Sequence, residues 1–460
     1  MNRAEKRAKK EEINVLNETI SIINRYFPEL INKFDNLTDL RHQSYVKYRM
    51  KVIFMVRLLG LMSSIKSMNE MTSEFNTKQA VENIAKICDL ELEEIPHCDT
   101  INDVFEQIKV NEIEEIRKYI ITRLIRGKIV NKFLIRDKYY HIIVDGTGLA
   151  TSRKKYNTNC LVKNKTDKNG NKYQEYSTYV LEAKLVLGDM VFSIGSEFVE
   201  NIDNQKFITR KIKKYKKMEG QKYKKVKNGK KNLNYAKYKQ DCEMKAFVRL
   251  AENIKKKYPR LKILISGDAL YANKTVLDTC KKYGWKYIIR FKEGAIPTLY
   301  KEFEQIVKRD NESNKADYEF VTKLDYNDYK INIIRYKETK NKKETEFIYM
   351  TDLPISNKNI EDSIFIGRKR WKIENEGFNI QKNGTFDIGH LYSKNATAIK
   401  VHYLMIQIAH IIRQLLEKGS IAIKSLKLKI KEISQLIQTT LISTYLNLSA
   451  TCRSQLRFDG

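Results

Sequence analysis

The chain has 460 residues, of which 42% are hydrophobic and 31% charged, so it is long enough for two to four domains with apolar cores. Its 87 Lys and Arg against 56 Asp and Glu give a net charge of +31, which favours a polyanionic partner, nucleic acid before a membrane surface. The six cysteines form no CxxC pair, and no apolar stretch is long enough to cross a bilayer. These features exclude a locally encoded zinc knuckle, a disulfide framework and a membrane-spanning helix, and we expect a soluble cytoplasmic protein. A basic protein without a polyanionic partner is the alternative.

Residues 1–135 are predicted to form a helical N-terminal domain, because apolar residues recur at three- and four-residue spacing. Asp99 or Thr100 is expected to cap a helix that begins near Ile101. This domain either recognises a specific DNA sequence or supports the next domain. The sequence contains no clear helix-turn-helix motif that would decide between them.

At residue 139 the apolar period changes to that of strands. The run YYHIIV is followed by Asp145-Gly146, which predicts a strand and its turn. The further predicted elements are strands at 177–187 and 190–198, a helix at 240–257, a strand at 261–266, a helix at 273–283 and a strand at 285–291. This order predicts an α/β fold with a mixed sheet flanked by helices.

Two insertions interrupt this core. Residues 203–239 are dense in lysine and tyrosine, while the stretch after residue 310 reads as three more strands. The expected units are 1–135 (helical), 136–296 (first part of the core, with the 203–239 insertion), 297–359 (β-rich insertion), 360–395 (core helix) and 396–460 (helical C-terminal region).

Asp145 and Asp268 each follow a buried-looking strand, in IIVDG and LISGDAL. Residues just past the carboxyl ends of neighbouring strands line the ligand crevice of an α/β sheet. Two carboxylates placed side by side raise each other's pKa, and a divalent cation removes that penalty. Oxygen ligands favour Mg²⁺ or Mn²⁺. A turn-forming role for each aspartate is the alternative.

A third element, RKRWKIENEGFNIQKNG, begins at Arg368 within a helix predicted at 363–382. Arg370 and Glu374 are four residues apart and share a helix face, with Lys382 on roughly the same face. These residues are either surface ion pairs or a metal ligand beside groups that grip phosphates. Trp371 is expected to pack in the core. His390 either assists near the metals or makes a structural hydrogen bond.

These three motifs resemble those of bacterial insertion-sequence transposases of the DDE class, which have an RNase H-like catalytic core. IIVDGTGL, SGDALYAN with KYIIRFKEG after it, and RWKIENEGFN occur in the order of the family's three catalytic carboxylates. One cut-and-paste group has a third motif Tyr-x2-Arg-x3-Glu-x6-Lys and a β-rich insertion before it. Arg370 and Glu374 fit that spacing, but Gly367 and Gln381 stand at the tyrosine and lysine positions, with Lys382 one residue later. Glu376 stays an alternative to Glu374.

The resemblance implies that Asp145, Asp268 and Glu374 hold two Mg²⁺ ions, which Mn²⁺ can replace, and that the enzyme cuts and joins DNA. It also implies double-stranded DNA as the partner (terminal inverted repeats and target), a homodimer on DNA with residues 397–444 as one candidate interface, and a nucleoid-associated bacterial location. Residues expected to contact DNA are Arg370, Lys382, Lys213, Lys216, Lys224 and Tyr223. The alternatives are an RNase H-like nuclease without strand transfer and a catalytically inactive DNA-binding protein.

Overall fold

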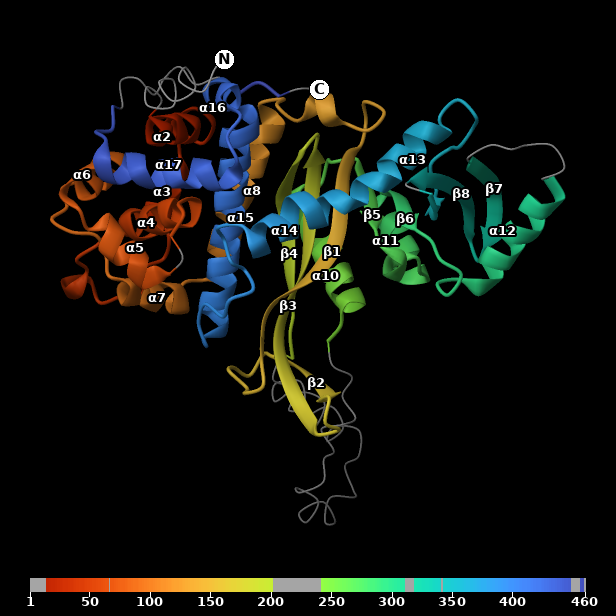
Figure 1. Cartoon of the computed structure of the whole chain (residues 1–460), viewed down its shortest axis with the longest axis horizontal. Helices are drawn as coiled ribbons and strands as arrows, with labels where there is room; N and C mark the ends of the chain where they lie inside the picture. The colour runs from red at the N-terminus through yellow and green to blue at the C-terminus, as the bar shows by residue number, and fades with distance from the viewer. Residues whose placement is uncertain are drawn as a thin grey trace, which may run out of the picture.

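The computed structural model describes residues 14–65, 67–201, 241–310, 318–340, 342–447 and 456–458. A helical part, a central sheet and an outer group of strands follow one another along the longest axis of the molecule (Figure 1). Within the described ranges, no helix is both long and apolar enough to span a membrane.

The helical part is built from N-terminal and C-terminal helices. Its N-terminal helices are α2 (Val15–Tyr26), α3 (Leu30–Asp35), α4 (Met50–Met62), α5 (Met68–Phe75), α6 (Lys78–Cys88), α7 (Cys98–Gln107) and α8 (Val110–Arg126). Three C-terminal helices, α15 (Ala396–Gly419), α16 (Ile421–Leu426) and α17 (Ile430–Ser443), complete it. Every residue of α4 is buried, as expected for a helix that is apolar on all sides and lies at the centre of a bundle.

The C-terminal helices belong to the N-terminal bundle. α15 packs against α2, α4, α7 and α8, and α17 packs against α2 and α6. The Asn83 side chain donates hydrogen bonds of 2.8 Å to the carbonyls of Leu441 and Thr444, which fixes the end of α17. α15 is buried along most of its length, and the dimer interface considered for residues 397–444 stays a prediction.

The described strands form one sheet of nine, in the order β2-β3-β1-β5-β6-β9-β8-β7, with β4 paired to β3. The strands are β1 (Tyr140–Ser152), β2 (Leu161–Thr166), β3 (Lys172–Leu187), β4 (Met190–Val199), β5 (Ile263–Gly267), β6 (Lys286–Arg290), β7 (Tyr318–Tyr326), β8 (Tyr329–Lys340) and β9 (Lys343–Thr351). β1, β3 and β4 are antiparallel, whereas β5 and β6 run parallel to β1. This is the expected mixed α/β sheet of an RNase H-like core.

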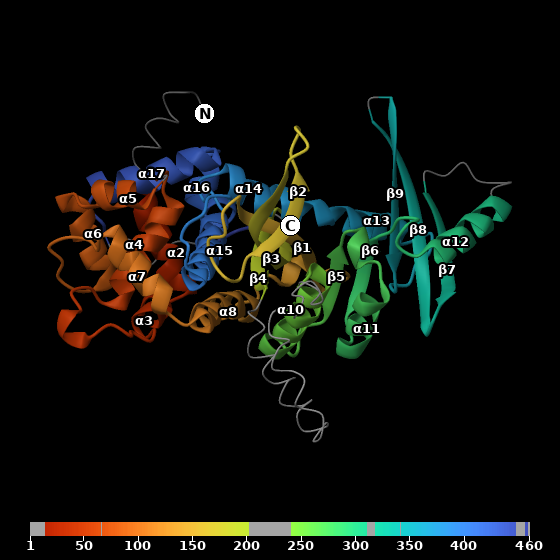
Figure 2. The ribbon, with the colours of Figure 1, turned by 90° about the horizontal axis from the view of Figure 1, so that it is seen from below.

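The three strands predicted after residue 310 are confirmed, and they extend the central sheet. β9 pairs with β6, so β7, β8 and helix α12 (Pro297–Asp310) lie at the far end of the molecule from the helical part (Figures 1 and 2). The sequence pattern predicted neither β2 nor the first part of β3. Those two segments pair with each other and project from the sheet.

Asp145-Gly146 was predicted to form the turn that ends its strand, but it lies inside β1. β1 keeps pairing with β3 as far as Ser152, opposite Tyr176. The glycine is needed for close packing rather than for a turn. A Cβ at residue 146 would lie 2.2 Å from the Tyr179 hydroxyl oxygen.

Helices cover both faces of the sheet. α10 (Glu243–Lys257) packs on one face, where Leu250 and Ile254 contact Gly195, and α11 (Lys274–Tyr283) packs beside it. The segment from α13 (Ile360–Arg368) to α14 (Asn379–Asn383) crosses the other face (Figure 1). The site lies at the sheet, between these two helical layers.

Candidate active site

Asp145 and Asp268 lie at the same level on neighbouring segments, Asp145 in β1 and Asp268 directly after β5. The last parallel pair of β1 and β5 is Ile143 with Ser266, and each aspartate lies two residues beyond it. The backbone N–H of Gly146 donates to Asp145 Oδ1 at 2.9 Å, and that of Leu270 donates to Asp268 Oδ1 at 2.9 Å. The predicted meeting of these two residues at one edge of the parallel strands is therefore found.

The electrostatics show that acidic groups converge on Asp145. Burial first, and then the charges of Asp268 and Glu243, raise the pKa of Asp145 to about 6, against the lowering effects of the Gly146 N–H and Arg370. A carboxyl group that binds a proton this readily is one on which a cation and a proton compete.

Glu243, at the start of α10, is a fourth carboxylate that the sequence analysis did not single out. The hydroxyls of Tyr179 and Tyr271 donate to its two oxygens at 3.1 and 2.5 Å. An acidic residue in the first turn of a helix is common because it interacts favourably with the helix dipole. Only the packing of α10 on the sheet brings this one to Asp145.

The third motif is less regular than the single helix predicted at 363–382. After α13 come a 3₁₀ turn (Lys369–Trp371), a π-helical turn (Ile373–Phe378) and α14. The π-helical turn is held on the sheet by a cluster of Ile143, Val186, Ile373 and Phe378. π-Helical turns are rare in proteins, and those that do occur often lie at functional sites.

Arg370 reaches Asp145, with 3.7 Å between its Nη1 and Asp145 Oδ2. The guanidinium carbon of Arg370 also lies 4.5 Å from the ring centroid of Trp371. The expectation that Trp371 packs in the core is wrong, because this side chain is 51% exposed. At the 3₁₀ turn it lies outside the apolar stripe formed by Ile373 and Phe378.

The surroundings of the two glutamates differ. Lys372 Nζ lies 2.8 Å from Asp189 Oδ1, in the β3–β4 turn. The pKa of Lys418 is raised, because the charges of Glu417, Glu376 and Asp189 outweigh the opposite effect of burial. Glu376 therefore lies on the side of Lys418 and Asp189, toward the same turn. Glu374 is four residues after Arg370, which faces Asp145. Glu376 is four residues after Lys372, which faces Asp189. This placement favours Glu374, whose carboxylate makes no hydrogen bond or ion pair with the described residues.

The two departures from the third motif have packing reasons. A Cβ at Gly367 would lie 2.7–2.9 Å from the Tyr349 ring, so a β9 tyrosine fills the space of a side chain at 367. Gln381 is fully buried and donates to Gln407 Oε1 at 2.9 Å, the same atom that receives a hydrogen bond from Lys184 Nζ at 2.9 Å. A lysine at 381 would place a second buried cation beside Lys184.

Arg290, at the end of β6, is a further basic group that the sequence analysis did not single out. Its Nη2 donates to the carbonyl of Glu346 at 2.6 Å, while Nη1 is buried without a hydrogen-bond partner among the described residues. Burial lowers the pKa of Arg290, and the nearby Arg370 contributes to that shift. Arg370 contacts Asp145 and Arg290 lies near Arg370, and two guanidinium groups close together suit a phosphate group.

Of the other predicted DNA contacts, only Lys382 is among the described residues. Lys382 is half-buried, with its Nζ 5.7 Å from the ring centroid of Phe378. Lys213, Lys216, Tyr223 and Lys224 lie outside the described residues. His390 is exposed and lines a cavity with residues of the N-terminal helices.

The donor set fits a hard divalent cation, because Asp145, Asp268, Glu243 and Glu374 offer only carboxylate oxygens. The ligand oxygens of Asp145, Asp268 and Glu374 do not all lie within 4.8 Å of one another. Two ions about 3.5–4 Å apart, each about 2.1 Å from its ligands, allow oxygens up to about 8 Å apart. A spacing above 4.8 Å therefore rules out a single shared ion but not a pair of ions.

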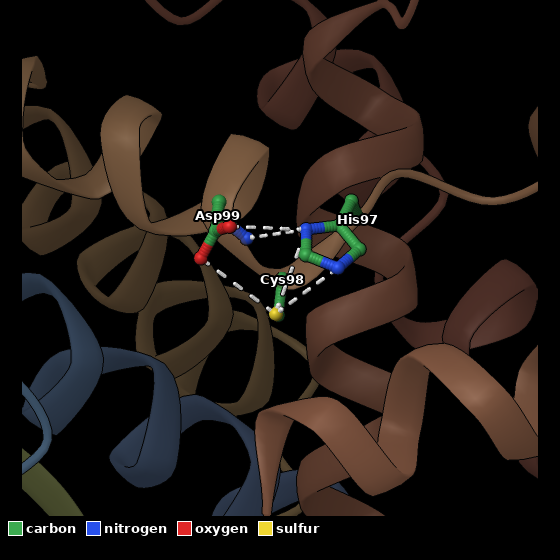
Figure 3. Close-up of side chains that lie close together, drawn as sticks. All are labelled: His97, Cys98 and Asp99. Atoms are coloured by element: carbon green, nitrogen blue, oxygen red, sulfur yellow. Dashed lines mark hydrogen bonds and ion pairs between the residues drawn. The ribbon is translucent and has the colours of Figure 1, made fainter.

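In the described part of the chain, one group of three possible ligand atoms does lie within 4.8 Å: His97, Cys98 and Asp99 (Figure 3). It is a helix cap. His97, rather than Asp99 or Thr100, caps α7 and accepts from the Asp99 N–H at 3.3 Å, while the Cys98 thiol donates to Asn69 Oδ1 at 2.9 Å. The positive end of the helix dipole disfavours a cation here.

Two family models match this chain. The family described as Transposase DDE domain group 1 matches residues 230–459, a range that includes Asp268, Arg370 and Glu374 and begins after Asp145. A second family, described as DDE_Tnp_1-associated, matches residues 31–119 in the N-terminal helices. A search of curated proteins found no match. The family match spans half of the chain, and the chain therefore belongs to the DDE transposase family, whose members bind DNA and cut it with divalent metal ions.

Proposed function

We propose that this transposase cuts DNA at transposon ends and joins the freed 3′-hydroxyl to target DNA, with Asp145, Asp268 and Glu374 as its metal-binding carboxylates. The observation that carries the proposal is the meeting of Asp145 and Asp268 just beyond the parallel pairing of β1 with β5, with Arg370 of the third motif at 3.7 Å from Asp145.

Two Mg²⁺ ions, which Mn²⁺ can replace, would activate the attacking hydroxyl and stabilise the leaving oxyanion. Asp145 and Asp268 would hold them from the sheet, and Glu374 from the π-helical turn. Because the pKa of Asp145 is about 6, this residue must lose its proton before it can serve as a ligand. Its neighbour Glu243, which accepts from two tyrosine hydroxyls, would position the strand ends rather than bind an ion.

The scissile phosphate would be held by Arg370 and Arg290. Arg370 pairs with Asp145 in the metal-free site, and with Asp145 serving as a metal ligand it would be able to pair with a phosphate oxygen instead. The unpartnered Nη1 of Arg290 offers a second donor on the same side. Both steps, hydrolysis and strand transfer, are in-line displacements at phosphorus, in which positioning and charge neutralisation supply most of the catalysis.

DNA outside the site would be bound by the basic surface. Lys382 and the Lys- and Tyr-rich residues 203–239 (with Lys213, Lys216, Tyr223 and Lys224) are the proposed contacts with the phosphate backbone and unpaired bases. The N-terminal helical domain, 1–135, would recognise the element ends. Because two transposon ends must be brought together, we expect a homodimer on DNA. Because the partner is DNA, we expect the protein to be associated with the nucleoid.

The test is strand transfer with purified protein, Mg²⁺ and a DNA fragment that carries the element's terminal repeats. Asp145→Asn, Asp268→Asn and Glu374→Gln should each lower the rates of cleavage and joining by about 10³-fold or more, because each removes a metal ligand. DNA binding in a gel-shift assay should be retained by all three.

Two outcomes would overturn this proposal in different ways. Cleavage without joined products would identify a nuclease that lacks strand transfer. Normal DNA binding without cleavage under Mg²⁺ or Mn²⁺ would identify a DNA-binding protein without this chemistry.

A further inference from the structure

A cavity of about 250 Å³ lies between the N-terminal helices and the segment that follows the third motif. Arg57 and Gly60 of α4 line it from one side, and Phe386, His390 and Tyr392 from the other. This space could hold several water molecules, each of which occupies about 30 Å³ in the liquid. The volume admits a small polar ligand, and the residues that line the cavity determine which one it binds.

Arg57 brings a buried positive charge to this cavity without a carboxylate partner. The residue is 7% exposed, its Nη2 lies 3.2 Å from His402 Nδ1, and its Nε has no hydrogen-bond partner among the described residues. No described carboxylate oxygen lies within the 4.0 Å of an ion pair with Arg57. A buried, uncompensated guanidinium group is costly, so a compensating anion is expected.

Tyr392 supplies a second donor at the same place. Its hydroxyl is buried and unpartnered among the described residues, and its ring stacks on His402 at 4.0 Å between centroids. The Arg57 guanidinium carbon lies 5.6 Å from the centroid of the same ring. Burial, Arg57 and His390 hold the pKa of His402 well below 6.5, so His402 is a neutral wall. Asp387, at the edge of the cavity, is exposed.

We propose that this cavity binds a phosphate group through Arg57 and Tyr392. A phosphate has enough acceptor oxygens for both donors and supplies the negative charge that Arg57 lacks. The cavity wall is tied to the third motif, because the Ile388 N–H donates to the carbonyl of Gln381 at 3.1 Å. A phosphate bound here holds the N-terminal helices against the segment that carries Glu374. The group comes either from the DNA backbone, which rests on the proposed function, or from free phosphate, which does not.

The first measurement is the thermal shift produced by inorganic phosphate against chloride at equal ionic strength. Arg57→Gln and Tyr392→Phe are compared with wild type and with Lys78→Gln, an exposed site that also loses one positive charge. We expect the phosphate Kd to rise at least about tenfold in Arg57→Gln and several-fold in Tyr392→Phe, with wild-type values in Lys78→Gln. Tyr392→Phe should fold normally, because its hydroxyl has no partner to lose and its ring still stacks on His402.

The second measurement is the salt dependence of binding to a mixed-sequence DNA duplex. If the backbone supplies the phosphate, Arg57→Gln lowers the slope of log K against log salt by about 1 more than Lys78→Gln does. An equal slope with a lost phosphate response identifies free phosphate as the ligand. If Arg57→Gln and Tyr392→Phe both match the Lys78→Gln control in both measurements, the proposal is overturned, whether or not the protein transposes DNA. If Arg57→Gln does not fold, the phosphate response of Tyr392→Phe decides the outcome.

Discussion

The aspartates and the third motif meet at one site, but different kinds of backbone hold them. Asp145 and Asp268 extend from strands whose ladder hydrogen bonds fix their register. Arg370 and Glu374 lie in a segment that changes from α to 3₁₀ to π geometry within a few residues and is held on the sheet through Ile373 and Phe378. The sheet-borne acids are thus preassembled, whereas the helix-borne acid depends on a side-chain cluster. Four measurements test this contrast.

The largest effect should separate the two glutamates of the π-helical turn. We expect Glu374→Gln to reduce the cleavage rate by about 10³-fold or more, because a metal ligand is lost, and Glu376→Gln to stay within about threefold of wild type. The matched variants share one turn and one chemical change, and single-turnover kinetics on a pre-formed complex measures both. Near-normal cleavage by Glu374→Gln would remove it from the site.

Asp145→Asn should stabilise the metal-free fold while it abolishes activity. The folded pKa of about 6 lies above the usual value of 3.8, so the folded state binds more protons than the unfolded state between these two pH values. The free energy of unfolding therefore falls as pH rises through this window and stays low above it. At pH 8 the substitution should raise it by on the order of 2 kcal/mol, after a discount for partial exposure. Urea unfolding with EDTA at pH 8 and pH 4 measures this, and no gain at pH 8 over pH 4 would contradict the burial argument.

The affinity for Mg²⁺ should depend on pH through the same proton on Asp145. Below a pH of about 6, the apparent Mg²⁺ affinity should fall by about tenfold for each further pH unit, because a proton on Asp145 competes with the ion. Above about pH 7 it should be nearly constant. Titration of activity against Mg²⁺ at a series of pH values measures the effect. A midpoint near pH 4 would show that Asp145 keeps an ordinary pKa when the protein binds DNA.

The smallest effect concerns Glu243. If it only adds charge near Asp145, Glu243→Gln shifts the midpoint of the Mg²⁺ competition down by a few tenths of a pH unit, because one repulsive charge is lost. The amide oxygen of the substituted side chain can still accept hydrogen bonds from Tyr179 and Tyr271. A drop in Mg²⁺ affinity of tenfold or more at pH 8 would instead make Glu243 a ligand.

Part of this fold could be read from local pattern. β-Branched runs marked β1, β4, β5 and β6, and apolar spacing marked most helices of the N-terminal bundle. The pattern failed where a segment's partner lies far along the chain. β2 and the start of β3 are polar and pair only with each other, and the third motif reads as one helix although its π-helical turn follows the contour of the sheet. Trp371, apolar in composition, is exposed because that change of helix geometry turns it away.

Local order in the sequence encodes part of the chemistry: two aspartates that follow β-branched runs, an Arg-x3-Glu spacing, and a positive charge suited to DNA. The tertiary structure alone decided what depends on contacts between distant segments. It brought Glu243 beside Asp145, filled the space at Gly367 with Tyr349, and placed Arg57 opposite Tyr392. Such contacts join residues on separate elements, in places hundreds of positions apart, and short-range periodicity carries no information about them.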